Sequence, residues 1–266
     1  MSVRADVRRP GMVPLPVAAA SALGLLALAG PVFSVLLSCS PHDLARAFLD
    51  REVLSAIGMS FLTATATALI SLVLGVPLAY ALSRSGGRLR SAVESVLAIP
   101  VLLPHTAAGI AVLSFFGPRS PFRPLMAFLL DRALGIIAAQ TFVSAPLLVF
   151  SARAAFDEVP VELELVARSL GASRTKAFLW VSLPLAKEGI LAGFLMAWAR
   201  ALSEFGAVVV IAYHPETAPV LVYRRFLISG LRGSQPVVVL LILLTACILA
   251  LASAFGMRPY GGARRA

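Results

Sequence analysis

The sequence predicts an all-α, polytopic membrane protein with six membrane-spanning helices. Of its 266 residues, 59% are hydrophobic and only 14% are charged, and the mean hydropathy is +0.91. A soluble domain fills its core with much less apolar sequence. Several apolar segments are also long enough to cross a bilayer, which takes about 20 helical residues. We therefore expect one transmembrane domain, residues 1–266, without a separate soluble domain.

Helices are expected for these segments because lipid offers no partner for the unpaired backbone groups of an open strand. The alternating segments of about ten residues that build membrane barrels are not seen in the sequence. The six expected spans are Met12–Ser38, Val53–Ser83, Ser91–Phe116, Leu134–Phe156, Ala186–Ala212 and Pro236–Met257.

Each of the first three spans has a distinguishing feature. The apolar run Met12–Ser38 is 27 residues long, more than the roughly 7–15 of a signal-peptide core, so we expect it to stay attached. Val53–Ser83 contains TATATALISLVLG, whose small residues let helices approach closely. Ser91–Phe116 carries Pro100 and Pro104, which a membrane helix tolerates when its neighbours satisfy the freed carbonyls.

The last three spans favour a packed bundle. Leu134–Phe156 also carries a proline, Pro146, and Ala186–Ala212 carries ionisable residues. Pro236–Met257 follows a long loop, Tyr213–Gln235, that mixes aromatic, aliphatic and basic residues. We expect this loop on the outer side of the membrane. Three alternatives are open for it: a plain solvated loop, a segment that re-enters the membrane surface, or a docking site for a partner.

The net charge of +10 is interpreted as a topology signal rather than as a nucleic-acid site. Of the 23 lysines and arginines, fourteen lie in the termini, the second loop and the fourth loop, and eight lie in the alternate loops. Because positive charge is retained in the cytoplasm, both termini are predicted to be cytoplasmic in a cell-membrane protein. The fourteen are Arg4, Arg8, Arg9, Arg84, Arg88, Arg90, Arg153, Arg168, Arg174, Lys176, Lys187, Arg258, Arg264 and Arg265.

A polar segment, residues 157–184, separates the fourth and fifth spans. An amphipathic helix is predicted after Pro160, and Glu164 and Arg168 are expected on its solvent face as a favourable i, i+4 pair. The apolar residues at i, i+3, i+4 and i+7 are Leu163, Val166, Ala167 and Leu170.

The rest of the polar segment predicts a turn and a second helix. Gly171 stands where a left-handed residue ends the first helix, and Ser173 can cap the next one. Pro184 is expected to break the run before the fifth span. From these physical features alone, a plain connecting loop remains the alternative.

The spacing within the polar segment resembles the EAA loop of ABC importer permeases. Glu164, Ala167 and Gly171 are followed, nine residues on, by Val181-x-Leu183-Pro184. Leu165 and Val166 depart from the family pattern, which commonly has small residues there. The resemblance implies that this loop couples to a separate ATPase through Glu164, Ala167, Arg168, Gly171, Ala172, Ser173 and Pro184.

Two further stretches resemble the molybdate/tungstate branch of that family, and less closely the sulfate branch. These are IPVLLPHTAAGIAV at 99–112 and RALSEFGAVVVIAYHPETAPVLVYRRF at 200–226. The resemblance implies a homodimeric permease for an oxyanion, two ATP-binding subunits and an extracytoplasmic binding protein. The chain has no Gly-x-x-x-x-Gly-Lys-Ser/Thr motif, so ATP and magnesium are expected on the partner, with no cofactor, catalytic residue or metal site in this chain.

The fifth span carries an unusual pair of ionisable residues, Arg200 and Glu204, one helical turn apart. Ionisable groups at membrane depth are costly, so they serve either as a mutually satisfied structural pair or as part of a pathway. On the second hypothesis, Arg200, Ser203, Glu204, Phe205 and Gly206 form a gate. His105 in the third span is expected to be packed rather than functional.

The sequence leaves two functions of other classes open. An ion-coupled secondary transporter needs intramembrane carboxylates, and Glu204 is the clear candidate. A membrane anchor or assembly factor has no need of the EAA-like spacing. Neighbouring genes for an ATPase and a binding protein distinguish these classes, and the choice among molybdate, tungstate and sulfate stays open.

Overall fold

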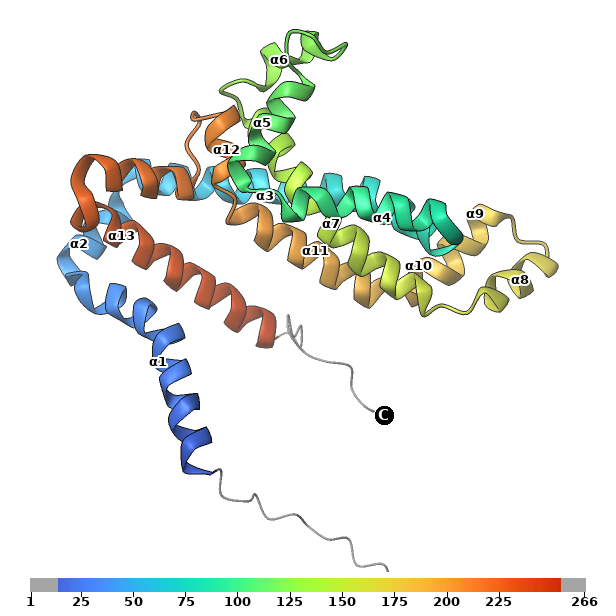
Figure 1. The fold of residues 1–266 in the computed structure, drawn as a ribbon, viewed down its shortest axis with the longest axis horizontal. Helices are drawn as coiled ribbons and strands as arrows, with labels where there is room; N and C mark the ends of the chain where they lie inside the picture. Colours follow the sequence, from blue (N-terminus) through green and yellow to red (C-terminus); the bar gives the residue numbers. More distant parts are fainter. Residues whose placement is uncertain (1–13, 255–266) are drawn as a thin grey trace, which may run out of the picture.

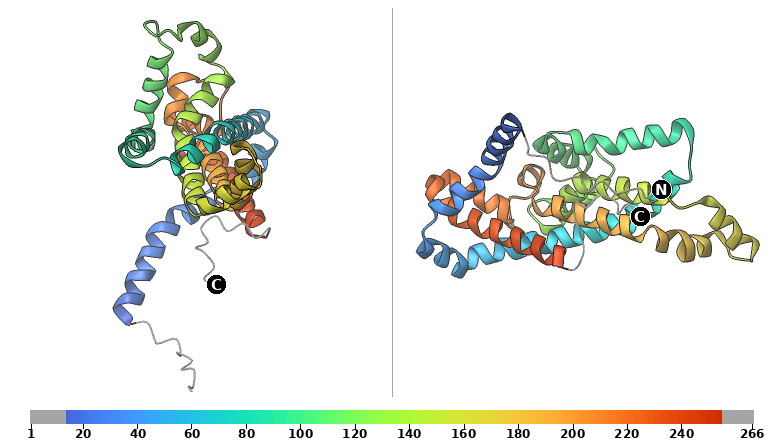
Figure 2. Two further views of the ribbon diagram at one scale, coloured as in Figure 1. Left: turned by 90° about the vertical axis from the view of Figure 1, so that its right-hand side faces the viewer. Right: turned by 90° about the horizontal axis from the view of Figure 1, so that it is seen from below.

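A computed structural model describes residues 14–254 of the chain, and all regular secondary structure in this part is helical (Figure 1). The ends of the first and sixth expected spans, residues 12–13 and 255–257, lie outside the described residues, as do the basic residues of both termini. The molecule is elongated, with the polar segment at one end and α2 (Pro41–Leu49) at the other (Figures 1 and 2).

The helices follow the expected spans closely at most of their ends. They are α1 (Leu15–Ser38), α2, α3 (Arg51–Ser83), α4 (Gly87–Leu102), α5 (His105–Phe115), α6 (Arg123–Leu129), α7 (Ala133–Asp157), α8 (Val161–Ser169), α9 (Arg174–Ala177), the π-helical turn η1 (Phe178–Ser182), α10 (Leu183–Leu185), α11 (Lys187–Leu202), α12 (Gly206–Ile211) and α13 (Ala218–Ala254).

By length and composition, four helices in the described part can each cross a membrane: α1, α3, α7 and α13. Two bent pairs of helices raise the number of spans to as many as six. The axes of α4 and α5 are bent by 117°, and those of the α9–α10 unit and α11 by 73°. The expected all-helical membrane architecture is therefore confirmed, and the four to six candidate spans include the expected six. The third and fifth spans are more broken than the sequence indicates.

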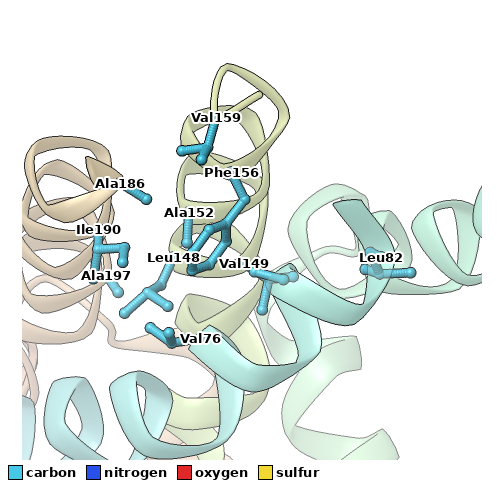
Figure 3. Packing of buried hydrophobic residues seen from close by; sticks show 11 residues of the cluster. Val76, Leu82, Leu148, Val149, Ala152, Phe156, Val159, Ala186, Ile190 and Ala197 are labelled. Atoms are coloured by element: carbon cyan, nitrogen blue, oxygen red, sulfur yellow. The ribbon is translucent and has the colours of Figure 1, made fainter. Parts of the chain in front are cut away.

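The core of the bundle lies where α3, α7 and α11 pack together. Figure 3 shows its apolar side chains, with Phe156 of α7 completely buried among residues of all three helices. Small residues permit this approach: a Cβ added at Gly75 would lie 2.9 Å from Leu148 Cδ2, and one at Gly193 would lie 3.1 Å from the Leu148 Cα. The expected role of the small residues in the second span is confirmed.

The third and fifth expected spans are each interrupted near their middle. Pro104 is the N-cap of α5, and Leu103 before it is extended, as the residue before a proline prefers. In the fifth span, α11 ends at Leu202 and α12 begins at Gly206, so Glu204 lies in the break rather than on a continuous helix.

The expected outer loop, Tyr213–Gln235, is largely helical and is not a plain solvated loop. Helix α13 begins inside it at Ala218, whose backbone N–H donates to Ser60 Oγ at 2.8 Å. At Gly230 the backbone has φ 65° and ψ −158°, a conformation that glycine adopts readily, and there the chain turns back on itself (Figure 1).

A cluster of ion pairs attaches the first arm of α13 to the start of α3. Arg225 pairs with Asp50 at 2.5 Å and with Glu52 at 2.7 Å. Arg224 pairs with Glu52 and, at 2.6 Å, with Glu216. The hydrogen bond from Arg225 is the main cause that lowers the pKa of Asp50, which therefore stays ionised. We call these five residues the Asp50 ion cluster.

Helix α1 differs from the other long helices because none of its residues is buried. It extends away from the bundle in Figure 1 and in the left view of Figure 2. Its apolar sequence, with a mean hydropathy of 2.1 in the best window, therefore needs either lipid or another protein surface to cover it.

Candidate functional site

The two interrupted spans meet at their breaks through three side chains, His105, Arg200 and Glu204. Arg200 Nη2 lies 2.7 Å from Glu204 Oε2, and His105 Nδ1 lies 2.9 Å from the same oxygen. Arg200 Nη2 also lies 2.7 Å from His105 Nδ1. We call these three residues the break cluster, since His105 begins α5 and the other two residues flank the end of α11.

Burial is distributed unevenly over the break cluster. The Glu204 side chain is 0% exposed, the Arg200 side chain 24% and the His105 side chain 55%. A buried carboxylate is tolerated only when it is paired and hydrogen-bonded. The expectation that His105 is packed is wrong: more than half of its side chain is exposed, although its Nδ1 contacts the buried Glu204.

Glu204 also caps the helix that follows it. Its second oxygen, Oε1, accepts a hydrogen bond of 2.8 Å from the backbone N–H of Ala207 in the first turn of α12. A carboxylate at this position satisfies an otherwise unpaired donor and interacts favourably with the helix dipole. Glu204 therefore defines the break as well as neutralising Arg200.

Residues that the sequence interpretation did not single out support the break. Gln140 of α7 is buried, and its Nε2 donates to the Ala201 carbonyl at the end of α11, at 3.0 Å. Thr67 Oγ1 donates to Gln140 Oε1 at 3.0 Å. A glutamine inside the apolar run of the fourth span was the only signal for this contact, because the partner is 61 residues away.

The other proposed gate residues also lie at this break. Ser203 is exposed, and its Oγ donates to the Arg200 carbonyl at 3.1 Å. Phe205 packs against Tyr223 of α13, with ring centroids 4.9 Å apart. A Cβ at Gly206 would lie 2.5 Å from His105 Cβ, so α5 and α12 touch at this glycine. The structure thus brings the five expected gate residues together and adds His105.

The polar segment has the predicted turn chemistry. Pro160 is the N-cap of α8, one position before the helix itself. Gly171 has φ +94°, so the predicted left-handed turn is confirmed. Ser173 caps α9 by accepting the Lys176 N–H at 3.2 Å, as predicted. Pro184 lies within α10, immediately before the 73° bend into α11.

The apolar stripe of α8 faces away from the bundle. Leu163 is 43% exposed, Val166 56% and Leu170 83%. Ala167 is half-buried, and its carbonyl accepts the Ala172 N–H at 3.0 Å. Exposed apolar residues gathered on one short helix at the end of a molecule are typical of a protein-interaction surface.

A hollow of about 630 Å³ lies beside this stripe. It is formed by the end of α7, the start of α8 and the start of α11, and Leu163 is among its lining residues. Glu158 and Glu188 place two exposed carboxylates at its wall. Arg168, Gly171 and Ser173 are also exposed, so most of the expected coupling residues are accessible to a partner.

Glu164 is the exception, and its expected place on the solvent face is wrong. It is 8% exposed and pairs with Arg84 of α3 at 2.6 Å instead of with Arg168. Burial raises the pKa of Glu164, but hydrogen bonds from Ser182, Tyr80 and Arg84 outweigh burial, so the pKa lies below its ordinary value. The helical periodicity predicts which residues of α8 share a face, but it does not predict which of these faces packs against α3.

Comparison with known families identifies a match over most of the chain. Residues 71–258 match the family model described as "Binding-protein-dependent transport system inner membrane component". The matched range contains the polar segment and both helix breaks.

Curated relatives carry more specific names. The "Molybdate/tungstate transport system permease protein WtpB" of Thermococcus kodakarensis is 45% identical over 202 residues, which is 76% of this chain and 78% of the relative. The protein of the same name from Pyrococcus abyssi is 46% identical over 198 residues, covering 74% of this chain and 76% of the relative.

Among solved structures, the chain is similar to one from a "bacterial alginate ABC transporter in complex with alginate pentasaccharide-bound periplasmic protein". The TM-score is 0.69 at 17% identity, and the match covers 93% of this chain and 95% of the other. At this identity the likeness establishes the fold, and it agrees with the helical architecture described above.

Proposed function

The chain belongs to the family of binding-protein-dependent transport system inner membrane components, and we propose that it is the permease subunit of an ATP-driven oxyanion importer. We propose molybdate or tungstate as the oxyanion. The observation that carries this assignment is the 45% identity over 202 residues to a relative named as a molybdate/tungstate transport permease. The resemblance of residues 99–112 and 200–226 to the same branch supports it.

The polar segment is the proposed docking site for an ATPase subunit. Its exposed stripe of Leu163, Val166 and Leu170 supplies apolar contact area, and the Gly171 turn presents it at the end of the molecule. Arg168, Ala172, Ser173 and Pro184 complete this surface. ATP and magnesium are assigned to the two ATPase subunits, and hydrolysis there drives movement of α8.

The break cluster is the proposed gate. His105 and Arg200 expose hydrogen-bond donors, whereas the buried Glu204 neutralises Arg200 and keeps it from holding an anion too tightly. A pathway for an oxyanion needs such moderated binding, because the ion must also leave. Ser203, Phe205 and Gly206 lie within the same break, where a change in the angle between α11 and α12 alters access.

Assembly and topology are further parts of the proposal. Two copies form the pathway between them, and the unburied apolar surface of α1 supports a role in contacting the second copy. An extracytoplasmic binding protein delivers the oxyanion from the side of the Asp50 ion cluster. Both termini and the polar segment lie in the cytoplasm, as the distribution of lysine and arginine favours.

Reconstitution tests this function. The chain is inserted into proteoliposomes with cognate ATP-binding subunits and a cognate binding protein, and uptake of radiolabelled molybdate and tungstate is measured. We expect uptake to require ATP and the loaded binding protein, to stop with vanadate and to resist excess sulfate. Uptake driven by an ion gradient without ATP contradicts the importer, and full competition by sulfate contradicts the substrate.

A further inference from the structure

Glu164 is the only buried residue of α8, and its partners come from two other elements. Tyr80 lies in the last turn of α3 and Arg84 is the C-cap of that helix. Ser182 is the last residue of the π-helical turn η1 and is itself buried. The Glu164 carboxylate therefore joins α8 to α3 and to η1, although Tyr80 is 84 residues away in the sequence.

Both oxygens of the Glu164 carboxylate are used. Oε1 accepts hydrogen bonds from Arg84 Nε at 2.9 Å, Arg84 Nη2 at 2.6 Å and Ser182 Oγ at 2.6 Å. Oε2 accepts from Tyr80 Oη at 2.7 Å. Hydrogen bonds to an ionised group are shorter and stronger than neutral ones, so this arrangement fixes the orientation of α8. We call Tyr80, Arg84, Glu164 and Ser182 the Glu164 cluster.

The surrounding backbone reinforces the Glu164 cluster. Arg84 also donates to the carbonyls of Phe156 and Val159, at 3.1 and 3.2 Å, where α7 ends and the chain turns toward α8. Ser182, which donates to Glu164, lies in the wider helical turn of η1. Such π-helical turns frequently occur at functional positions. The local backbone on both sides of α8 is thus built around one carboxylate.

Opposite sides of α8 have different surroundings. Val166 and Leu170 are exposed on one side, where a partner can reach them, and Glu164 is enclosed on the other. Helix α3 continues from the cluster for 33 residues, packs along α7 and α11, and ends at the Asp50 ion cluster. A movement of α8 that is transmitted to α3 therefore reaches the opposite end of the molecule.

We propose that Glu164 is a positioning residue that fixes α8 to the end of α3, so that a partner displacing α8 moves α3 with it. The inference rests on the proposed function, because the ATPase subunit supplies the displacement. It changes the role that the EAA resemblance implies for Glu164: the side chain holds α8 to its own bundle and does not touch the ATPase.

The first experiment needs no partner. Spin labels are placed at Ala81→Cys on α3 and Leu170→Cys at the end of α8, both exposed, in full-length permease in nanodiscs. The native cysteines Cys39 and Cys247 are replaced by serine. Pulsed electron paramagnetic resonance then reports the distribution of distances between α8 and α3.

We expect a narrow distribution with Glu164 intact and a broadened one in Glu164→Gln, because the amide cannot replace the ion pair with Arg84. Glu162→Gln is the matched control, since Glu162 lies on the same helix and is exposed. If Glu164→Gln does not fold, Ser182→Ala and Tyr80→Phe remove one hydrogen bond each and give the same readout. An unchanged distribution in the folded variants overturns the proposal.

The second experiment measures coupling in the reconstituted importer. We expect Glu164→Gln to retain its ATPase subunits and to hydrolyse ATP, yet to import at least about five-fold fewer oxyanions per ATP, the low end of usual coupling between sites. Glu162→Gln should keep the wild-type ratio. Loss of ATPase co-purification in Glu164→Gln, with the distribution of distances between α8 and α3 unchanged, shows a direct contact and overturns the proposal. The same loss with a broadened distribution agrees with a displaced α8 and supports it. If the wild type itself does not import, the proposed function fails, and the spin-label distances still decide the role of Glu164.

Discussion

His105 and Glu204 connect two helix breaks that lie 99 residues apart in the sequence, through a contact of 2.9 Å between Nδ1 and Oε2. One break separates α4 from α5 and the other separates α11 from α12. Helices α5 and α12 also pack directly, because a Cβ at Gly109 would lie 2.8 Å from the Ala207 carbonyl oxygen. The two interrupted spans therefore share one contact region, so a change in helix packing at one break alters the contacts at the other.

The close approach of α5 and α12 at Gly206 gives the first prediction. In Gly206→Ala the new Cβ would lie 2.5 Å from His105 Cβ and 3.2 Å from the Thr106 backbone nitrogen. Overpacking of this kind costs about 1–3 kcal/mol, so we expect a lower Tm and reduced uptake. Gly58→Ala is the control, since no atom lies within 4 Å of its added Cβ. Thermal unfolding of both variants in detergent should separate them, and equal Tm values contradict the packing argument.

The second prediction concerns the turn of the polar segment. Gly171 has φ +94°, and its N–H donates to the Arg168 carbonyl at 3.0 Å. Proline can adopt neither this φ nor the donor role, so Gly171→Pro should remain in the membrane but lose hydrolysis stimulated by the loaded binding protein. Alanine costs about 1–2 kcal/mol in this conformation and should give a partial loss.

Gly87 provides a matched control for this turn. Its φ is +70°, and nothing lies within 4 Å of an added Cβ, so Gly87→Ala carries similar backbone strain at a different loop. We expect Gly87→Ala to retain coupling at a comparable Tm. Normal stimulated hydrolysis in Gly171→Pro would remove the polar segment from the coupling path.

The third prediction tests the topology. The single cysteines Arg88→Cys and Arg232→Cys, made without Cys39 and Cys247, should react with an impermeant maleimide from opposite sides of the membrane. Both positions are exposed, and Arg232 follows the bend of α13 at Gly230. Ser234 in the same sequence region is 5% exposed and is therefore a poor probe. Labelling of both cysteines from one side rejects the six-span arrangement.

The helical architecture follows from the sequence because the hydrophobic length of a span is a local property. The turn at Gly171 and the cap at Ser173 were also predictable, since both depend on residues within one turn. The break in the fifth span was not predictable in this way. Membrane helices are apolar on all sides, so hydropathy gives no sign that Ser203 ends α11.

The remaining differences between the sequence-based expectations and the structure arise from contacts between residues far apart in the sequence. Glu164 was expected to be exposed with Arg168, and the structure pairs it with Arg84, 80 residues earlier. His105 was expected to be packed, and in the structure its side chain is 55% exposed while its Nδ1 contacts Glu204. In both cases the local pattern identifies an ionisable residue of interest, while its partner depends on how the spans pack against one another.

The last prediction separates a structural role of the break cluster from a gating role. Removing Arg200 leaves the buried Glu204 carboxylate with only His105 and the Ala207 N–H beside it, and removing Glu204 leaves Arg200 without its carboxylate partner. Losing one partner of a buried ion pair costs about 3–5 kcal/mol. Arg200→Met and Glu204→Gln alone should therefore lower the amount of folded permease. The double variant should recover it, because the amide oxygen introduced by Glu204→Gln can still accept the Ala207 N–H that the carboxylate accepts now. Radiolabelled oxyanion uptake, normalised to folded permease, decides between the roles: a gate predicts that the double variant is stable yet impaired or leaky, whereas full uptake leaves only the structural role.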